Sequence, residues 1–267
     1  MHALECGAGP AVLALHGQPG LGSDFSELAG LLERDHLVIA PDRPGYGASG
    51  EEAIGIAEAA RRFAAFVEER ALAPAVVVGH SFGAGIASLL AATYPSSVRG
   101  LVLVAPVGVA RALGVPDRLV ALRGAGEVMA MGALSSFGVL LPPLRRAGAR
   151  APAPLGEWLS ATLPDERYRE VAAAAGRRVW RSFVAEQRFL LDEIRAVEES
   201  LAAVRVPTEV LSGTWDLVVR PWSAAAVADA IPGARLVTLP RAGHLLTRDA
   251  PEAIALAVRR VEREGAR

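Results

Sequence analysis

Short apolar runs rich in β-branched residues alternate with longer segments of helical spacing along most of this chain. Such alternation constrains a chain to a mostly parallel sheet that is covered by helices on both faces. Buried strands are predicted at residues 11–15, 37–40, 75–78, 101–104, 208–211 and 235–239. Helical spacing falls between them, at residues 24–33, 52–70, 82–94, 223–231 and 251–263. The pattern predicts an α/β fold with a doubly wound sheet.

The alternation stops after residues 101–104 and resumes at Pro207. No strand pattern occurs in between, and prolines and glycines divide this stretch, so we expect several short helices folded over the edge of the sheet. The sequence therefore predicts a core domain at residues 1–106 and 206–267, interrupted by a helical cap at residues 107–205.

The composition excludes several classes of protein. The apolar runs are shorter than the roughly 18 residues that a membrane span needs. The formal net charge of −1 provides no basic field for nucleic acid or an anionic membrane surface. All basic residues are arginine, which excludes lysine chemistry, and the single cysteine, Cys6, cannot form an internal disulfide. The first residues lack a basic segment followed by an apolar one, so we expect a cytoplasmic protein without a signal peptide.

A candidate nucleophile lies in Gly79-His80-Ser81-Phe82-Gly83, directly between the predicted strand at 75–78 and the predicted helix at 82–94. This is the G-x-S-x-G pattern in the context that it requires. The two glycines are needed because side chains at such a tight turn would collide with the neighbouring strand and helix. The turn lifts the hydroxyl of Ser81 out of the sheet.

A serine hydroxyl needs a base within hydrogen-bond reach and a third group that orients the base. His244 follows the last predicted strand, on the same carboxyl edge of the sheet as Ser81, and is our candidate base. His80 adjoins the serine but is expected to face away. His16 and His36 lie at strand boundaries and are assigned to packing or loop hydrogen bonds, and His2 lies in the N-terminal segment.

The candidate acid is Asp216, which follows the strand at 208–211 at the same edge of the sheet. Asp42 belongs to an early turn, and Asp192 lies inside the cap. Asp249 stands just before the last helix, where we expect it to cap that helix. The predicted triad is therefore Ser81, Asp216 and His244.

Acyl transfer also needs hydrogen-bond donors for the oxygen that becomes negative in the tetrahedral intermediate. One donor is predicted to be the backbone N–H of Phe82, the residue after the nucleophile. The other is assigned to Gln18, because its neighbour Pro19 has no N–H. A purely structural turn is the alternative interpretation of this loop.

These residues resemble the α/β-hydrolase-fold enzymes that carry a helical cap, and the resemblance covers nearly the whole chain. The order Ser81, Asp216, His244 is the order of that family. The resemblance implies a mostly parallel, eight-stranded sheet with the cap inserted after the sixth strand. It also implies that the turn from Asp42 to Ser49 is structural. The motifs that carry it are His16-Gly17-Gln18-Pro19-Gly20, Pro41-Asp42-Arg43-Pro44-Gly45-Tyr46-Gly47-Ala48-Ser49, Gly79-His80-Ser81-Phe82-Gly83, Asp216 and Gly243-His244.

The resemblance also separates reactions by the nucleophile. Haloalkane dehalogenases and epoxide hydrolases of this fold carry aspartate where Ser81 stands, so both are disfavoured. Proline iminopeptidases typically have tryptophan after the serine and glycine before it, and Phe82 and His80 differ from that pattern. Amide hydrolysis and haloperoxidase, perhydrolase or hydroxynitrile lyase chemistry stay open on the motifs.

We expect a hydrolase, of an esterase-like class, that cleaves a carboxylic ester, thioester or lactone through an acyl-enzyme on Ser81. The alternatives are carbon–carbon bond hydrolysis of β-diketone-like substrates on the same triad, or a small-molecule receptor of the same fold. No cofactor or metal is expected. The expected partner is a small, largely hydrophobic substrate, and neither a nucleic acid nor a membrane is expected as a partner. The protein is expected to be a monomer or homodimer.

Apolar cap residues could roof the acyl pocket or simply pack the cap onto the sheet. The candidate substrate-binding residues are Met129, Phe137, Trp158 and Trp180. Arginines at helical spacing, namely Arg177, Arg178 and Arg181, could grip an anionic substrate. We expect them instead to form a solvated face with Glu170 and Glu186.

Overall fold

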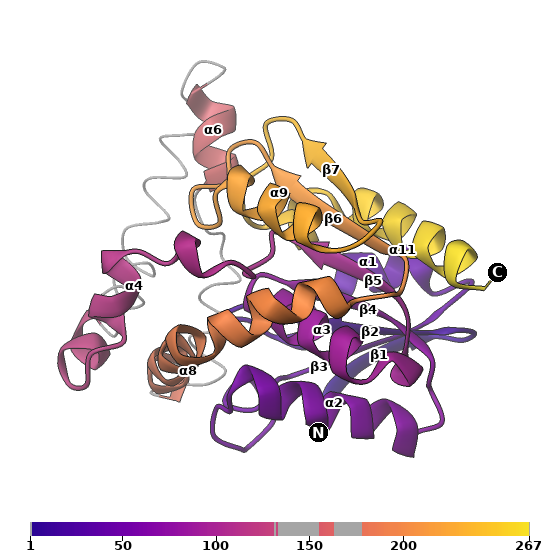
Figure 1. The fold of residues 1–267 in the computed structure, drawn as a ribbon, viewed down its shortest axis with the longest axis horizontal. Helices are drawn as coiled ribbons and strands as arrows, with labels where there is room; N and C mark the ends of the chain where they lie inside the picture. The colour runs from indigo at the N-terminus through magenta and orange to yellow at the C-terminus, as the bar shows by residue number, and fades with distance from the viewer. Residues whose placement is uncertain (1, 131, 133–154, 163–177, 267) are drawn as a thin grey trace.

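A twisted, seven-stranded sheet runs through the middle of the molecule (Figure 1). The computed structural model describes residues 2–130, 132, 155–162 and 178–266. Every residue of the central strand β4 is buried, as expected for a strand covered on both faces. The strands are β1 (Ala3–Gly7), β2 (Ala11–Leu15), β3 (Leu37–Pro41), β4 (Ala75–His80), β5 (Val98–Val104), β6 (Thr208–Gly213) and β7 (Arg235–Leu239).

The strands lie in the order β1-β3-β2-β4-β5-β6-β7. The edge strand β1 pairs with β3 antiparallel, and all other described neighbours pair in parallel. From β2 the chain moves outward to β3 and then crosses back to β4 on the other side of β2. The carboxyl ends of β2 and β4 therefore flank the point where the strand order reverses, which is where open α/β sheets bind ligands.

Helices cover both faces of the sheet. Those between or after strands are α1 (Ser26–Leu32), α2 (Ile56–Glu69), α3 (Phe82–Thr93), α9 (Pro221–Ala230), α10 (Leu246–Asp249) and α11 (Pro251–Gly265). Between β5 and β6 lie α4 (Val115–Val120), α6 (Leu155–Thr162) and α8 (Arg178–Ser200), and residues 125–130 are helical as well. Short 3-10 turns are η1 (Gly22–Phe25), η2 (Pro95–Ser97), η3 (Ala110–Ala112) and η4 (Leu201–Ala203).

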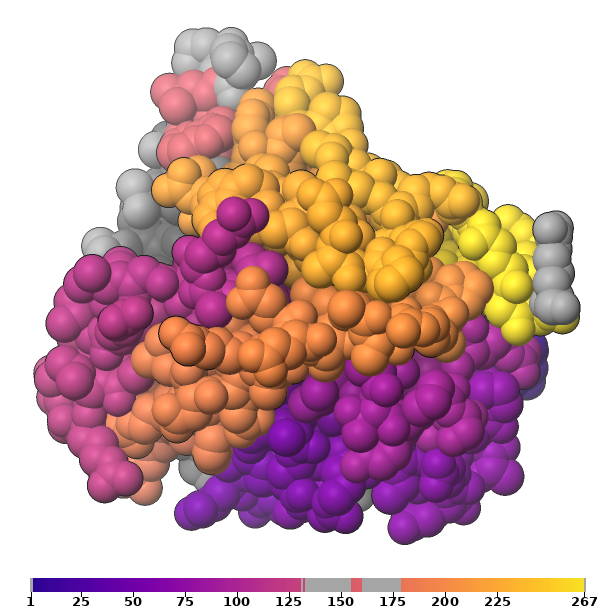
Figure 2. Space-filling view, in the orientation of Figure 1, coloured from indigo at the N-terminus to yellow at the C-terminus, as the bar shows by residue number. Residues whose placement is uncertain are grey.

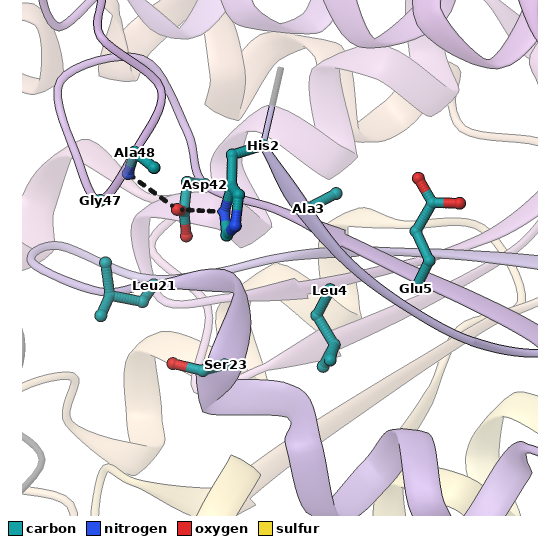
Figure 3. Close-up of a pocket in the computed structure, with 9 residues that line it drawn as sticks. All are labelled: His2, Ala3, Leu4, Glu5, Leu21, Ser23, Asp42, Gly47 and Ala48. Atoms are coloured by element: carbon teal, nitrogen blue, oxygen red, sulfur yellow. Dashed lines mark hydrogen bonds and ion pairs between the residues drawn. The ribbon is translucent and has the colours of Figure 1, made fainter.

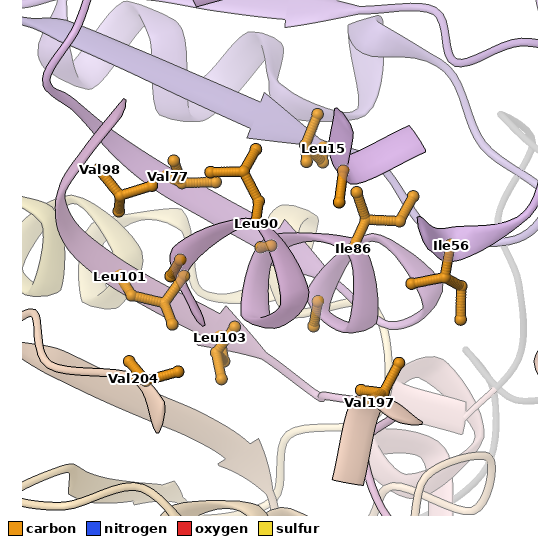
Figure 4. Packing of buried hydrophobic residues seen from close by; sticks show 14 of the residues in the cluster. Leu15, Ile56, Val77, Ile86, Leu90, Val98, Leu101, Leu103, Val197 and Val204 are labelled. Carbon is orange, nitrogen blue, oxygen red and sulfur yellow. The ribbon is translucent and has the colours of Figure 1, made fainter. Parts of the chain in front are cut away.

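The apolar core has two layers, one on each face of the sheet. One layer packs α2, α3 and α9 against the sheet, and Figure 4 shows Ile86 and Leu90 of α3 against Val77 and Leu101 of the strands. The other layer packs α1 and α11, with Leu28 among its buried residues. Side chains of β2 alternate between the layers, because successive residues of a strand point to opposite faces.

Helix α8 extends over 23 residues within the stretch predicted as the cap, and it also packs into the core. Its residues Leu190, Ile194 and Val197 are buried in the same apolar layer as α3. Figure 2 shows this orange segment crossing the surface between the purple N-terminal half and the yellow C-terminal part. The expectation of several short helices is wrong here, because no proline interrupts residues 165–206.

The predicted α/β fold class is confirmed. The described sheet has seven strands, one fewer than the resemblance implies, and the helical stretch follows β5, the fifth strand. The sequence pattern did not delimit β1, whose half-exposed edge position gives it a mixed composition. Within the described residues, no helix combines the length and the apolarity needed to cross a membrane.

We predict that Leu90→Ala lowers the free energy of unfolding by about 2–5 kcal/mol, because it leaves a cavity in a fully buried layer. Leu256→Ala is the matched control in helix α11, where the side chain is 59 % exposed. Its effect should stay within about 0.5 kcal/mol. Urea unfolding of both variants tests this, and equal losses would contradict the assignment of the core.

Candidate active site

Ser81 lies at the turn between β4 and α3 with φ 53° and ψ −116°, in the region that side-chain-bearing residues rarely adopt. Its N–H donates to the carbonyl of Val104 at 2.9 Å, which anchors the turn to β5. A Cβ on Gly79 would lie 2.6 Å from Ala84 Cα, and a Cβ on Gly83 would clash with the carbonyl of Leu15. Both glycines are therefore required by close packing, as the sequence predicts.

His244 and Asp216 form a hydrogen-bonded pair. Nδ1 of His244 lies 2.8 Å from Oδ2 of Asp216, whose side chain is fully buried. The other oxygen, Oδ1, accepts the N–H groups of Val218 and Val219 at 2.9 and 2.8 Å. Because a carboxylate only accepts, the imidazole proton resides on Nδ1 and leaves Nε2 as the basic atom.

The loops that carry these two residues are joined to each other. The N–H of Trp215 donates to the carbonyl of Ala242 at 2.9 Å, and the N–H of Arg241 donates to Oγ1 of Thr214 at 2.8 Å. Gly213 allows this approach, since a Cβ there would clash with the carbonyl of Ala242. The geometry of the pair is thus set by backbone contacts as well as by its own hydrogen bond.

His80 contacts His244, whereas the sequence analysis expected it to face away from the site. Its Nε2 donates to the backbone carbonyl of His244 at 3.0 Å, and the two rings lie 4.9 Å apart. Burial, reinforced by the neighbouring imidazole of His244, lowers the pKa of His80 to about 3. His80 is therefore neutral and supports the loop of His244 from below the nucleophile.

Between Ser81 and His244 the structure shows no hydrogen bond. Such contacts are often long in the absence of substrate and tighten when a reacting group is bound. The hydrogen bond from Nε2 of His80 nevertheless holds the backbone of His244, and the imidazole of His244 packs against that of His80, the residue that precedes the nucleophile.

The loop after β2 packs directly against the nucleophile. A Cβ on Gly17 would lie 3.1 Å from Cβ of Ser81. The side chain of Gln18 donates to the carbonyl of Phe183 on α8 at 2.7 Å. Within the described part of the chain, the backbone N–H groups of Gln18 and Phe82 donate to no other residue. Both predicted oxyanion donors are thus available.

The predicted substrate-binding residues are not brought together in the same way. Met129 and Trp158 are exposed, and Trp180 is half-buried beneath the guanidinium of Arg181 at 5.2 Å. Phe137 lies outside the described residues. No contact between the described members of this set and Ser81 is found, so their role stays a prediction.

Of the remaining aspartates, Asp192 is exposed on α8. Asp249 accepts a hydrogen bond from Nε of Arg248 at 2.5 Å, and the α11 N-cap residue is Ala250. The expectation that Asp249 caps the last helix is therefore wrong.

Asp42 has a structural role. Its carboxylate accepts the N–H groups of Gly22 and Ala48 at 2.9 and 3.0 Å, and His2 contacts it at 2.8 Å. Figure 3 shows the carboxylate between His2 and the turn, at the side of a hollow lined by the N-terminal residues and by Leu21. This hollow contains none of the triad candidates.

A buried ion pair joins Arg43 to Glu186, and the sequence pattern did not predict it. Glu186 was expected on a solvated face, but it is fully buried, and it contacts the guanidinium of Arg43 and the hydroxyl of Tyr46. Arg177 and Glu170 lie outside the described residues. The signal was the spacing of Glu186 from Val179 and Leu190, which places it on the buried face of α8.

We predict that His80→Gln reduces the loss of stability in acid. Between pH 6.5 and about 3 the unfolded chain binds a proton at His80 that the folded protein excludes, so stability falls as the pH falls. This group contributes about 1.4 kcal/mol per pH unit in that window. Glutamine keeps an N–H donor for the carbonyl of His244 but does not titrate. Urea unfolding at pH 7, 6 and 5 should give a shallower slope for the variant, and parallel slopes would contradict the neutral assignment.

The chain is similar to known proteins in sequence and in fold. The chain is 27 % identical to lipase 1 of Psychrobacter immobilis over 89 % of this chain and 72 % of the lipase. It is also 27 % identical to a haloalkane dehalogenase of Bradyrhizobium diazoefficiens, over 93 % of this chain and 86 % of that protein. The fold matches the structure of a thermophilic esterase from Thermogutta terrifontis with a TM-score of 0.72 at 22 % identity, covering 99 % of this chain and 93 % of the esterase. A model of the Alpha/beta hydrolase family matches residues 12–258, and the chain therefore belongs to that family.

Proposed function

We propose that this protein is a serine hydrolase that cleaves a carboxylic ester, thioester or lactone of a small, largely hydrophobic substrate. The observation that carries the proposal is the hydrogen-bonded pair of Asp216 and His244, which packs against His80, the residue before a serine held in a strained turn. A base whose proton is fixed on Nδ1 is oriented to take a proton at Nε2. Family membership supports a hydrolase, and the similarity to a lipase supports an ester as the substrate.

In the proposed reaction, Oγ of Ser81 attacks the carbonyl carbon while its proton passes to Nε2 of His244. The electron pair of the carbonyl double bond moves to the oxygen, which accepts the N–H groups of Gln18 and Phe82. Each such donor is typically worth about 3 kcal/mol in the transition state. When the tetrahedral intermediate collapses, His244 gives the proton to the departing alcohol, thiol or ring oxygen. Water then attacks the acyl-enzyme by the same route and releases the acid.

The nucleophile distinguishes the proposed reaction from the reaction of the dehalogenase among the relatives of this chain. The resemblance on which the sequence analysis relied places aspartate at the nucleophile position of such enzymes, whereas this chain has Ser81. Transfer of an acyl group to Ser81 gives an acyl-enzyme. This species is an ester, which water can cleave with the help of His244. Carbonyl substrates therefore fit this site better than alkyl halides.

Ser81→Ala should abolish the hydrolysis of p-nitrophenyl esters, because it removes the attacking oxygen. The measurement is kcat/KM for esters of increasing acyl length, together with fluorophosphonate labelling of the wild type and the variant. Ser88→Ala is the matched control, since Ser88 is a second buried serine of the same segment and its hydroxyl has no described partner.

Ester turnover that survives in Ser81→Ala would contradict the proposal. A vinylogous β-diketone is measured in parallel, and turnover of that substrate alone would assign carbon–carbon bond hydrolysis instead. A wild type that neither turns over substrate nor reacts with the fluorophosphonate would favour a receptor.

Asp216→Asn should lower kcat/KM by about 10⁴-fold while the protein stays folded. The asparagine oxygen can still accept the N–H groups of Val218 and Val219, but its amide would donate to Nδ1 of His244. The imidazole proton would then move to Nε2, which could no longer take the proton of Ser81. Asp192→Asn, on the exposed face of α8, should retain full activity, and equal effects of the two changes would contradict the choice of acid.

A further inference from the structure

The peptide unit between Gly17 and Gln18 is held from one side by two hydrogen bonds. Its carbonyl, which belongs to Gly17, accepts one hydrogen bond from Nη2 of Arg43 at 2.8 Å and another from Nδ1 of His16 at 2.9 Å. Its N–H, which belongs to Gln18, is the proposed oxyanion donor. A trans peptide is planar, with its carbonyl and its N–H pointing in opposite directions. Fixing the carbonyl therefore fixes the direction in which the N–H points.

Arg43 is itself fixed at every nitrogen of its side chain. Nε donates to the carbonyl of His16 at 2.9 Å, and both terminal nitrogens donate to the carboxylate of Glu186. The guanidinium carbon lies 4.9 Å from the ring centre of Phe82 and 5.2 Å from that of Tyr46. The backbone N–H of Arg43 also donates to Nε2 of His16 at 2.9 Å.

His16 completes this arrangement as a neutral group. Because a backbone N–H can only donate, Nε2 of His16 accepts from Arg43, and the proton on Nδ1 donates to the carbonyl of Gly17. Burial and the nearby guanidinium of Arg43 hold the pKa of His16 well below its usual value. The imidazole therefore keeps this tautomer at neutral pH.

Glu186 comes from helix α8, not from the core loops that it supports. Its side chain is fully buried, and Tyr46 Oη donates to it at 2.7 Å. Burial raises the pKa of Glu186, while the contacts with Arg43 and Tyr46 oppose that rise. A buried ion pair recovers its desolvation cost only with good geometry, and apolar residues of similar volume often serve stability as well. Stability alone therefore does not account for a pair at this position.

From these contacts we infer that Arg43 and Glu186 are positioning residues, through which the docked helix α8 orients the oxyanion donor of Gln18. The inference rests on the proposed function. Without Glu186, the guanidinium of Arg43 would be left buried and unpaired, and it would turn away from the carbonyl of Gly17. The peptide unit of Gln18 would then keep only the hydrogen bond from His16, so the direction of its N–H would be less well fixed, although the triad itself would be unchanged.

The test compares Glu186→Gln with the apolar double variant Arg43→Met/Glu186→Leu. Glutamine keeps the shape of Glu186 but removes the charge that holds Arg43. The double variant removes the pair without leaving a buried charge, so it stays folded even if Glu186→Gln is destabilised. Ser182→Ala is the control on the same helix, since its hydroxyl donates to the carbonyl of Gly45 and does not touch the oxyanion loop.

Four quantities are measured: kcat and KM for a p-nitrophenyl ester, the second-order rate at which a fluorophosphonate labels Ser81, and the melting temperature. The phosphoryl oxygen of the probe occupies the oxyanion site, so labelling reports on the donors without depending on the natural substrate. We expect both test variants to lose at least 10-fold in kcat and in labelling rate, with KM within about threefold of the wild type. Ser182→Ala should remain within about twofold in all three kinetic values.

Folded test variants that keep wild-type kcat and labelling rate would overturn the inference. It would also be overturned if the loss were confined to KM, because α8 would then shape only the substrate pocket. If the wild type itself were not labelled at Ser81, the proposed function would fail, and the positioning role would fail with it.

Discussion

At Gly83 the first turn of α3 approaches the carbonyl groups of Leu15 and His16 so closely that a methyl group would not fit. This approach draws three elements together at one point, namely the end of β2, the end of β4 and the start of α3. The strained backbone of Ser81 persists because its neighbours on β5 and α3 leave it no other conformation. The same approach places the loop that follows β2 against the nucleophile. The candidate site is thus a consequence of how tightly the centre of the sheet packs.

The remaining parts of the site are fixed by polar contacts that leave few groups free to move. The loops of Asp216 and His244 are joined through backbone hydrogen bonds, and His80 links the second of these loops to the strand that carries Ser81. On the other side, Arg43 and His16 hold the carbonyl of Gly17. His16 and His80 are both neutral and buried, so the directions of their hydrogen bonds do not change at neutral pH. A site built in this way is organised before the substrate binds.

The sequence predicted the parts of this structure that depend on local pattern. Continuous apolar runs revealed the central strands, and five consecutive residues around Ser81 revealed the turn, because its sterics are local. The sequence pattern did not predict the edge strand β1, because one of its faces is exposed and it pairs with β3 through the backbone. The ion pair between Arg43 and Glu186 joins residues 143 positions apart. The periodicity of α8 marks the position of Glu186 as buried, but no local pattern names its partner.

Helix α8 contacts both the candidate site and the apolar core, and this makes the helix costly to move. Lifting the helix would expose Leu190, Ile194 and Val197, at a cost of about 1.5–3 kcal/mol for each side chain. It would also separate the buried charges of Glu186 and Arg43. The helix is therefore held in place beside the loop that follows β2. Any rearrangement around Ser81 that keeps this apolar layer intact therefore has to leave α8 in place.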